Sequence, residues 1–217
     1  MHKTVNNLLS IQNQLKELNL NSQFPKIIAV SKTFGMDNIE PLIEHGQKHF
    51  GENKIQEAID KWVDVKNRNQ EIKLHMLGKI QTNKVKFLIP LFDYIHSMDS
   101  LKLADKIASE QVKKNKKLKI FIQVNLANEF QKSGINKNSL ESFYKKCKES
   151  FELNIIGLMC LPPVNENPEK YFLELKSLAK ELSLEKLSMG MSNDYLKAAK
   201  CGSNFLRIGS NIFGPRN

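Results

Sequence analysis

The sequence predicts one α/β domain, residues 1–217, built as a (β/α)8 barrel of parallel strands. Short apolar runs, many of them β-branched, alternate with amphipathic helical segments along the 217 residues. Eight such runs occur, which is the number that closes this barrel, and the chain length is near the lower end for the architecture. A hydrophobic fraction of 41% and a charged fraction of 26% are typical of an ordinary globular protein.

The expected strands are apolar or β-branched runs of three to eight residues, bounded by Gly, Pro, Ser or Asn. In chain order they cover residues 24–31, 48–51, 72–77, 94–97, 118–125, 155–159, 187–189 and 204–208.

The expected helices place their apolar residues at helical spacing, as Ile55, Ile59 and Trp62 do. Gly46 and Gly202 are expected to end two of them, and Pro168 sits in a tolerated first turn. The seven helices between strands cover residues 37–44, 52–65, 82–91, 100–114, 139–150, 168–182 and 193–200.

The eighth outer helix is missing from its usual place, because only nine residues follow Ile208. Residues 4–20 carry an apolar stripe that includes Val5, Leu8 and Leu15. We therefore expect this N-terminal helix to complete the outer ring. An open, doubly wound sheet is the alternative architecture on this pattern.

The formal net charge of +10 does not by itself indicate a nucleic-acid partner. Only three of the 33 basic residues are arginines, the side chain that reads guanine bidentately, and the lysines are spread along the chain. The densest group, residues 113–119, fits a solvated helix end. We expect no nucleic-acid partner.

Cysteine and histidine spacing indicates neither a metal site nor a disulfide framework. The three cysteines, Cys147, Cys160 and Cys201, are far apart, and His45 and His49 are separated by a probable helix end at Gly46. No apolar run is long enough to cross a bilayer, and the first residues lack the apolar core of a signal peptide. We expect a cytoplasmic protein without a membrane partner.

Lys32 is the first candidate for chemistry, because an apolar strand delivers it to the carboxyl end of the barrel, where working residues gather. A desolvated amine loses affinity for its proton, and a neutral amine can form a Schiff base with an aldehyde. The alternative is an ordinary solvated lysine at a strand end.

The loops after the last two strands have the composition of a phosphate site. Ser192 follows Gly190 before one helix, and Gly209-Ser210 precedes another helical turn. Helix N-termini at these two loops commonly bind phosphate in such barrels, although ordinary N-capping by serine is the alternative. Arg207 lies on the last strand, where a buried guanidinium needs a partner, and a structural salt bridge is its alternative role. A lysine, a phosphate cup and a nearby cation together describe a pyridoxal 5′-phosphate site.

Several segments in fixed order resemble the pyridoxal phosphate homeostasis protein family, which is similar to the barrel domain of alanine racemase. They are Ala29–Thr33, Phe50–Glu57, Gly78–Lys84, Val124–Asn125, Lys132–Ile135, Gly157–Met159, Leu187–Ser192 and Arg207–Arg216.

The resemblance implies a Schiff base between the cofactor and Lys32, with Ser192, Gly209 and Ser210 at the phosphate and Arg207 at the pyridine nitrogen. It also implies that Asn53 and His75 line the pocket. Leu74, Lys79 and Ser210 depart from the residues usual in the family at their positions.

The resemblance further implies a cofactor carrier, acting in intracellular vitamin B6 balance with pyridoxal-phosphate-dependent apo-enzymes as possible partners. A cation beside the ring nitrogen disfavours protonating it, which weakens carbanion chemistry. A vestigial racemase is the alternative, but racemisation needs an acid–base group on each face of the substrate, and no tyrosine falls in a motif at the second face. We therefore assign no catalytic residue, and we expect a monomer. Lys84 and Lys132 could assist cofactor release or be surface charge.

Overall fold

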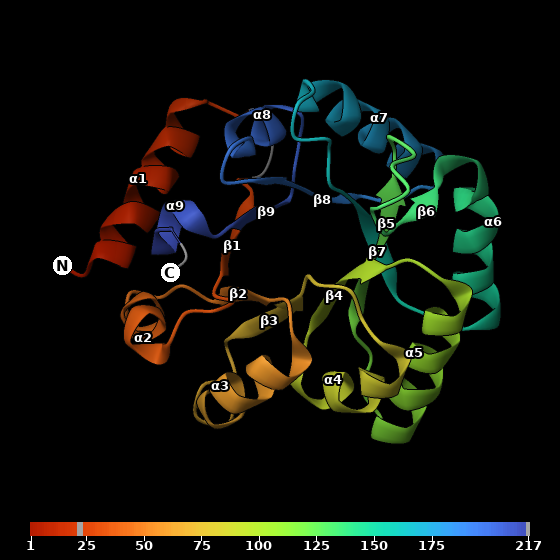
Figure 1. Cartoon of the computed structure of the whole chain (residues 1–217), viewed down its shortest axis with the longest axis horizontal. Coiled ribbons are helices and arrows are strands. Elements are labelled where there is room, and N and C mark those ends of the chain that lie inside the picture. The colour runs from red at the N-terminus through yellow and green to blue at the C-terminus, as the bar shows by residue number, and fades with distance from the viewer. Residues whose placement is uncertain (21–23, 216–217) are drawn as a thin grey trace.

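Eight parallel strands close into a barrel surrounded by helices in the computed structural model, which describes residues 1–20 and 24–215 (Figure 1). Hydrogen-bonded neighbours run β1-β2-β3-β4-β5-β7-β8-β9, and β9 pairs with β1 to close the ring. The strands are β1 Lys26–Val30, β2 His49–Glu52, β3 Lys73–Met76, β4 Tyr94–Met98, β5 Lys119–Asn125, β6 Ile135–Asn136, β7 Ile155–Cys160, β8 Lys186–Met191 and β9 Phe205–Ile208. The predicted (β/α)8 barrel is confirmed, and the open sheet is excluded.

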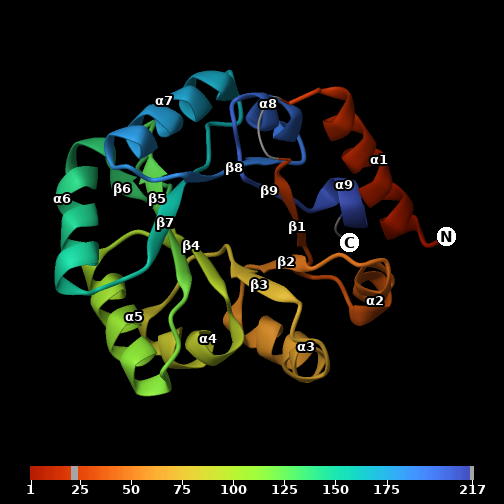
Figure 2. The same ribbon diagram turned by 180° about the vertical axis from the view of Figure 1, so that it is seen from behind.

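The helices occupy the outside of the ring, as both opposite views show (Figures 1 and 2). They are α1 Lys3–Glu17, α2 Met36–Glu44, α3 Ile55–Arg68, α4 Val85–Leu91, α5 Leu101–Lys114, α6 Leu140–Lys145, α7 Pro168–Glu181, α8 Tyr195–Lys200 and α9 Ser210–Phe213. Short 3-10 turns, Thr82–Lys84 and Lys137–Ser139, precede α4 and α6.

Helix α1 fills the gap in the outer ring, as predicted. It packs against α2 on one side and against α8 and α9 on the other (Figure 1). Val5, Leu8, Ile11 and Leu15 of its inner face are buried. Burial of apolar area, at about 25 cal/mol per Å², holds this short helix in place because its isolated propensity is weak.

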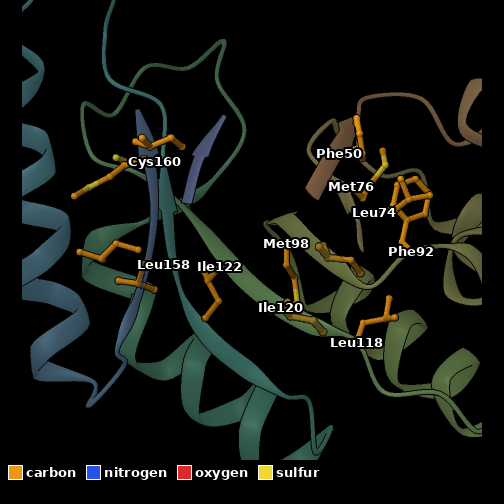
Figure 3. Close-up of a cluster of buried hydrophobic side chains, with 14 of the residues drawn as sticks. Phe50, Leu74, Met76, Phe92, Met98, Leu118, Ile120, Ile122, Leu158 and Cys160 are labelled. Carbon is orange, nitrogen blue, oxygen red and sulfur yellow. The ribbon is translucent and has the colours of Figure 1, made fainter. Parts of the chain in front are cut away.

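The main hydrophobic core lies between the barrel wall and the helices (Figure 3). Alternate strand residues supply it, because successive side chains point to opposite faces of a strand. Leu74 and Met76 of β3, for example, are fully or almost fully buried in this core. The other labelled members of the cluster are Phe50, Phe92, Met98, Leu118, Ile120, Ile122, Leu158 and Cys160.

The residues between these positions fill the inside of the barrel. Ile28, Tyr94, Phe121, Met159 and Phe205 form a second, separate apolar cluster there. His75 lies between two core residues of β3 and therefore points inward, where its ring stacks on Tyr94 at a centroid distance of 4.2 Å. The barrel interior is thus packed rather than hollow, with polar side chains among the apolar ones.

The elements expected around residue 52 and over residues 139–150 differ from the structure. Strand β2 continues through Glu52, which pairs with Met76 of β3, so the predicted helix start at residue 52 is wrong and α3 begins at Ile55. The single helix expected over residues 139–150 is broken into the turn, α6 and a π-type turn, Lys146–Ser150.

The short strand β6 is an addition that the pattern did not predict. It pairs with β5 outside the ring of eight, following Gly134 at φ 132°. A Cβ on Gly134 would lie 2.8 Å from the backbone nitrogen of Asn125, so only glycine permits this approach.

Candidate functional site

A cavity of about 500 Å³ opens at the carboxyl ends of the strands. Its size is within the range of small-molecule sites. Lys32 from the end of β1, Asn53 after β2 and Arg207 on β9 line it, together with Ser192, Gly209 and Ser210 from the last two loops. Six of the seven predicted site residues therefore meet in one place.

The loop that carries Lys32 is held by a buried carboxylate. Glu52 is fully buried, and its Oε1 accepts hydrogen bonds from Ser31 Oγ at 2.7 Å and from Trp62 Nε1 at 2.9 Å. Lys61 Nζ lies 2.8 Å from the same oxygen and donates to the Ser31 carbonyl at 2.9 Å. These bonds fix the residue before Lys32, so the half-buried lysine leaves a rigid strand end.

Glu57 fixes the other side of the same loop. Its Oε1 accepts from the backbone N–H of Thr33 at 2.5 Å and pairs with Lys61 at 2.9 Å. Although partial burial works in the opposite direction, these hydrogen bonds lower the pKa of the Glu57 carboxyl. Thr33 itself has φ 69°, a left-handed conformation that this contact stabilises.

Arg207 is a buried cation with fixed partners. Its side chain is 5% exposed, Nη1 donates to Ser188 Oγ at 2.6 Å, and Nη2 donates to the carbonyl of Cys160 at 2.9 Å. Burial lowers the pKa of the guanidinium, but its starting value leaves it a cation at neutral pH. The structural salt bridge considered above is absent, since Arg207 has no ion pair among the described residues.

The two glycine- and serine-containing loops lie against each other, as their place on neighbouring strands suggested. Asn211 Nδ2 donates to the Ser192 carbonyl at 2.9 Å, and the Asn211 N–H contacts Ser192 Oγ at 3.4 Å. Asp194 holds the first loop by accepting from the Met191 N–H at 2.6 Å. Gly209 precedes α9. A Cβ added at Gly209 would lie 3.5 Å from the nearest atoms of Val30, which is an ordinary van der Waals distance. The fold itself therefore does not require glycine at this position.

His75 is the predicted residue that the structure does not bring to the cavity. It is fully buried inside the barrel, below the site, in a chain of hydrogen bonds. His49 Nδ1 lies 2.9 Å from His75 Nε2, His75 Nδ1 lies 2.9 Å from His96 Nε2, and His96 Nδ1 lies 2.8 Å from Ser188 Oγ. Because Ser188 also bonds Arg207, His75 is connected to the site through two other side chains.

Burial keeps this histidine chain neutral. It lowers the pKa of His75 and of His96 well below 6.5, and the neighbouring histidine and Arg207 charges act in the same direction. Neutral imidazoles bond each other as one donor and one acceptor, which fits a chain of single hydrogen bonds.

No group of three or more possible metal ligands occurs within residues 1–20 and 24–215.

The sequence reasoning missed the residues that support the site from behind. The residues are Ser188, His96 and Glu52. Each is a polar residue within a short apolar strand, a feature that can be recognised in the sequence. A polar residue in a buried strand needs a partner, but the partner's identity depends on strand register.

Lys132 and Lys84 lie on different parts of the structure. Lys132 Nζ donates to the carbonyls of Leu161 and Pro162, in the loop after β7 that lines the cavity, and pairs with Glu129. Lys84 is exposed beside the Phe87 ring. Arg216 lies outside the described residues.

Comparison with known proteins gives the family. The pattern described as "Alanine racemase, N-terminal domain" matches residues 7–217. The Pasteurella multocida protein named "Pyridoxal phosphate homeostasis protein" is 32% identical to this chain, with 97% of each covered. The Aquifex aeolicus protein of the same name is 36% identical, over 88% of this chain and 87% of its own. This chain belongs to the pyridoxal phosphate homeostasis protein family.

Solved structures agree with the family membership. The structure of PipY from Synechococcus elongatus PCC7942 with PLP bound is 31% identical, with a TM-score of 0.83 over 94% of this chain and 100% of PipY. An alanine racemase from Clostridium difficile 630 shares the barrel at a TM-score of 0.74 and 15% identity, with 56% of that chain covered. At that identity the racemase likeness shows the fold alone. In the described part of the chain, no helix is long and apolar enough to cross a membrane.

Proposed function

We propose that this protein binds pyridoxal 5′-phosphate at the carboxyl end of its barrel and buffers the cofactor in vitamin B6 homeostasis. The observation that carries the proposal is the meeting of Lys32, the two serine- and glycine-containing loops and the buried cation Arg207 in one cavity. Each fits one part of the cofactor: an amine for the aldehyde, N–H and hydroxyl donors for the phosphate, and a fixed guanidinium for the ring nitrogen.

The side chains of this site are suited to binding and orienting the cofactor. Lys32 would hold the cofactor through its amine, and the cofactor would supply the aldehyde chemistry at that position. Arg207 is anchored by Ser188 and Cys160 and donates only, so it cannot hand a removable proton to the ring nitrogen. Ser192, Gly209 and Ser210 orient the phosphate, and Asn53 bounds the pocket beside Lys32.

The residues around the cavity favour a carrier over a racemase. None of the four tyrosines lines it: Tyr94 is inside the opposite end of the barrel, and Tyr171 and Tyr195 bond Glu166 and Gln14. The lining carboxylates, Glu166 and Asp194, are engaged with Tyr171 and the Met191 N–H. Within residues 1–20 and 24–215, the cavity is therefore lined by no tyrosine and by no carboxylate without a partner, although Lys197 also lines it. We assign the protein no catalytic role.

The cofactor site is tested by absorbance and borohydride reduction of the purified protein loaded with pyridoxal phosphate. Lys197 lines the same cavity and provides the matched control. We expect the visible band and a reduced adduct on the Lys32 peptide in the wild type and in Lys197→Ala, and neither in Lys32→Ala. An adduct on another lysine, or no band in the wild type, would refute the proposal. Racemisation of L-alanine by the loaded protein would refute the carrier assignment alone.

Transfer completes the proposed role: the loaded protein gives its cofactor to pyridoxal-phosphate-dependent apo-enzymes in the cytoplasm and acts as a monomer. Activation of an apo-enzyme by the loaded protein is the measurement, with an equal concentration of free cofactor as reference. Activation no faster than dissociation into solution would contradict direct transfer. Light scattering tests the monomer.

A further inference from the structure

The opposite, amino-terminal end of the barrel carries a ring of lysines that the cofactor site does not use. In (β/α)8 barrels, side chains of alternate strands form layers of four across the interior. The first residue of each of four alternate strands is a lysine here. They are Lys26 of β1, Lys73 of β3, Lys119 of β5 and Lys186 of β8.

All four lysines point towards the inside of the barrel mouth. Each lies two residues before an interior position, and side chains two apart share a face of a strand. The interior positions are Ile28, His75, Phe121 and Ser188. The contacts of two of them agree, since Lys26 Nζ lies 5.9 Å from the centre of the Phe205 ring and Lys119 Nζ lies 5.3 Å from that of Tyr94. Lys73 Nζ donates to the carbonyl of Gln70, which lines the same opening, at 3.1 Å.

The lysine ring surrounds open space. Two cavities of about 450 Å³ each lie at this end and share Lys26, Lys119 and Tyr94. Lys186 lines one of them, and Lys73 lines the other, together with His49. The floor is formed by the rings of Tyr94 and Phe205, so the opening is a cationic rim above an aromatic base.

The positive charge of the rim is not balanced. Glu71 and Glu185 are the carboxylates that line the two cavities, and they pair with Lys48 at 3.1 Å and with Lys186 at 3.9 Å. Within residues 1–20 and 24–215, no carboxylate lies within ion-pair distance of the other three ring lysines. Like charges held at one opening repel each other, and an anion there would relieve that repulsion.

The histidine chain ends at this opening, and in one of its two hydrogen-bond directions it presents an N–H donor there. Arg207 can only donate, so Ser188 Oγ accepts from it, and the same hydroxyl either donates to His96 Nδ1 or accepts from it. The Ser188 donor case sets one direction for the whole chain. Neutral His96 then carries its proton on Nε2 and donates to His75 Nδ1, and His75 donates from Nε2 to His49 Nδ1 in the same way. In that direction His49 carries its proton on Nε2, the nitrogen that does not bond His75.

The electrostatics of His49 reflect the lysine rim. Burial lowers the pKa of His49 to about 4, and the charge of Lys26 acts in the same direction. The charge of Asp93 opposes this shift, and those of Lys73 and Lys119 add to it. The imidazole is therefore neutral at pH 7, placed among cations.

We propose that this amino-terminal mouth is a second ligand site, which binds a small multivalent oxyanion through Lys26, Lys73 and Lys119, with His49 beside them. The ligand class is a phosphorylated or polycarboxylic small molecule, because both present several charged oxygens to ammonium and N–H donors. The site is at the other end of the barrel from Lys32 and does not depend on the proposed cofactor.

The test is a titration of the cofactor-free protein with pyrophosphate and, separately, with citrate at constant ionic strength. Imidazole nitrogen signals of the ¹⁵N-histidine-labelled protein report binding at His49, with smaller shifts expected at His75 and His96. The variant Lys26→Gln/Lys119→Gln removes two rim charges, and Lys102→Gln/Lys114→Gln removes two exposed charges from α5 as its matched control. Each lost charged contact weakens binding by about tenfold or more, whereas the control stays within about twofold of the wild type.

Binding of pyrophosphate alone assigns the site to phosphorylated ligands, and binding of citrate alone assigns it to polycarboxylates. The proposal is overturned if neither anion shifts His49, if sodium chloride produces the same shifts, or if both double variants weaken binding equally. Thermal unfolding of the two variants separates a lost site from a lost fold.

Discussion

Replacing Ser188 with alanine tests the hydrogen-bond chain that holds Arg207. Ser188 Oγ accepts from Arg207 Nη1 at 2.6 Å and bonds His96 Nδ1 at 2.8 Å, and all three side chains are buried. A hydrogen bond to a charged group contributes about 1.5–3 kcal/mol, and the neutral bond to His96 adds about 1 kcal/mol. We expect Ser188→Ala to lower the free energy of unfolding by about 2–4 kcal/mol, which lowers the Tm by roughly 5–15 °C for a domain of this size.

Ser97→Ala provides the matched control for that measurement. Ser97 is also a buried strand serine, but its Oγ donates only to the neutral carbonyl of Gly78, at 2.6 Å. Its loss should cost about 1 kcal/mol. Urea unfolding of the cofactor-free wild type and both variants gives the comparison. A Ser188→Ala variant no less stable than Ser97→Ala would refute the idea that Ser188 connects a buried cation to the histidine chain.

Three further predictions follow from burial, charge and close contacts. The pKa of His49 is about 4 in the folded protein and about 6.5 in the unfolded chain. Between these two pH values the unfolded chain binds more protons than the folded protein. The free energy of unfolding therefore falls as the pH is lowered from 6.5 to 4. His49→Gln should flatten that fall by up to about 1.4 kcal/mol per pH unit in pH-dependent urea unfolding, and an unchanged slope would contradict the assignment. Gly209→Ala should keep the wild-type Tm, because its Cβ would lie 3.5 Å from Val30, yet weaken pyridoxal phosphate binding measured by absorbance; unchanged affinity would show that the ligand does not approach this backbone. Burial raises the thiol pKa of Cys147 and Cys160 to about 12, so neither should react with a disulfide reagent until the protein unfolds, and rapid labelling of the native protein would be the contrary result.

The sequence was informative wherever structure depends on nearby residues. Strand β5 and helix α5 are each specified by their own apolar period, and their expected ranges agree with the structure to within a residue at either end. The phosphate-type loops were also found, because Gly, Ser and a following helix are neighbours in the chain. Glu52 was assigned to a helix instead of a strand because its decisive partners, Ser31 and Trp62, are 21 and 10 residues away.

The inside of the barrel could not be predicted in the same way. His49, His75, His96 and Ser188 are separated along the chain by 26, 21 and 92 residues, and they lie on four different strands, β2, β3, β4 and β8. Their contacts therefore depend on how the strands are placed around the ring. The resemblance implied that His75 lines the pocket, and nearby Leu77 does line it. Strand alternation and register instead place the His75 imidazole inside the barrel.

The lysine ring is another feature that depends on the arrangement of distant strands, and it can be recognised once the strand order is known. A lysine at the start of a strand is unremarkable alone, since a solvated cation suits any strand end. Once the closed strand order makes β1, β3, β5 and β8 alternate members of one barrel, their first residues become a single layer. Four ammonium groups in one layer repel each other more strongly than lysines dispersed over the surface. A bound anion would offset that repulsion. The amino-acid composition could not show this, because it does not tell which lysines share a layer.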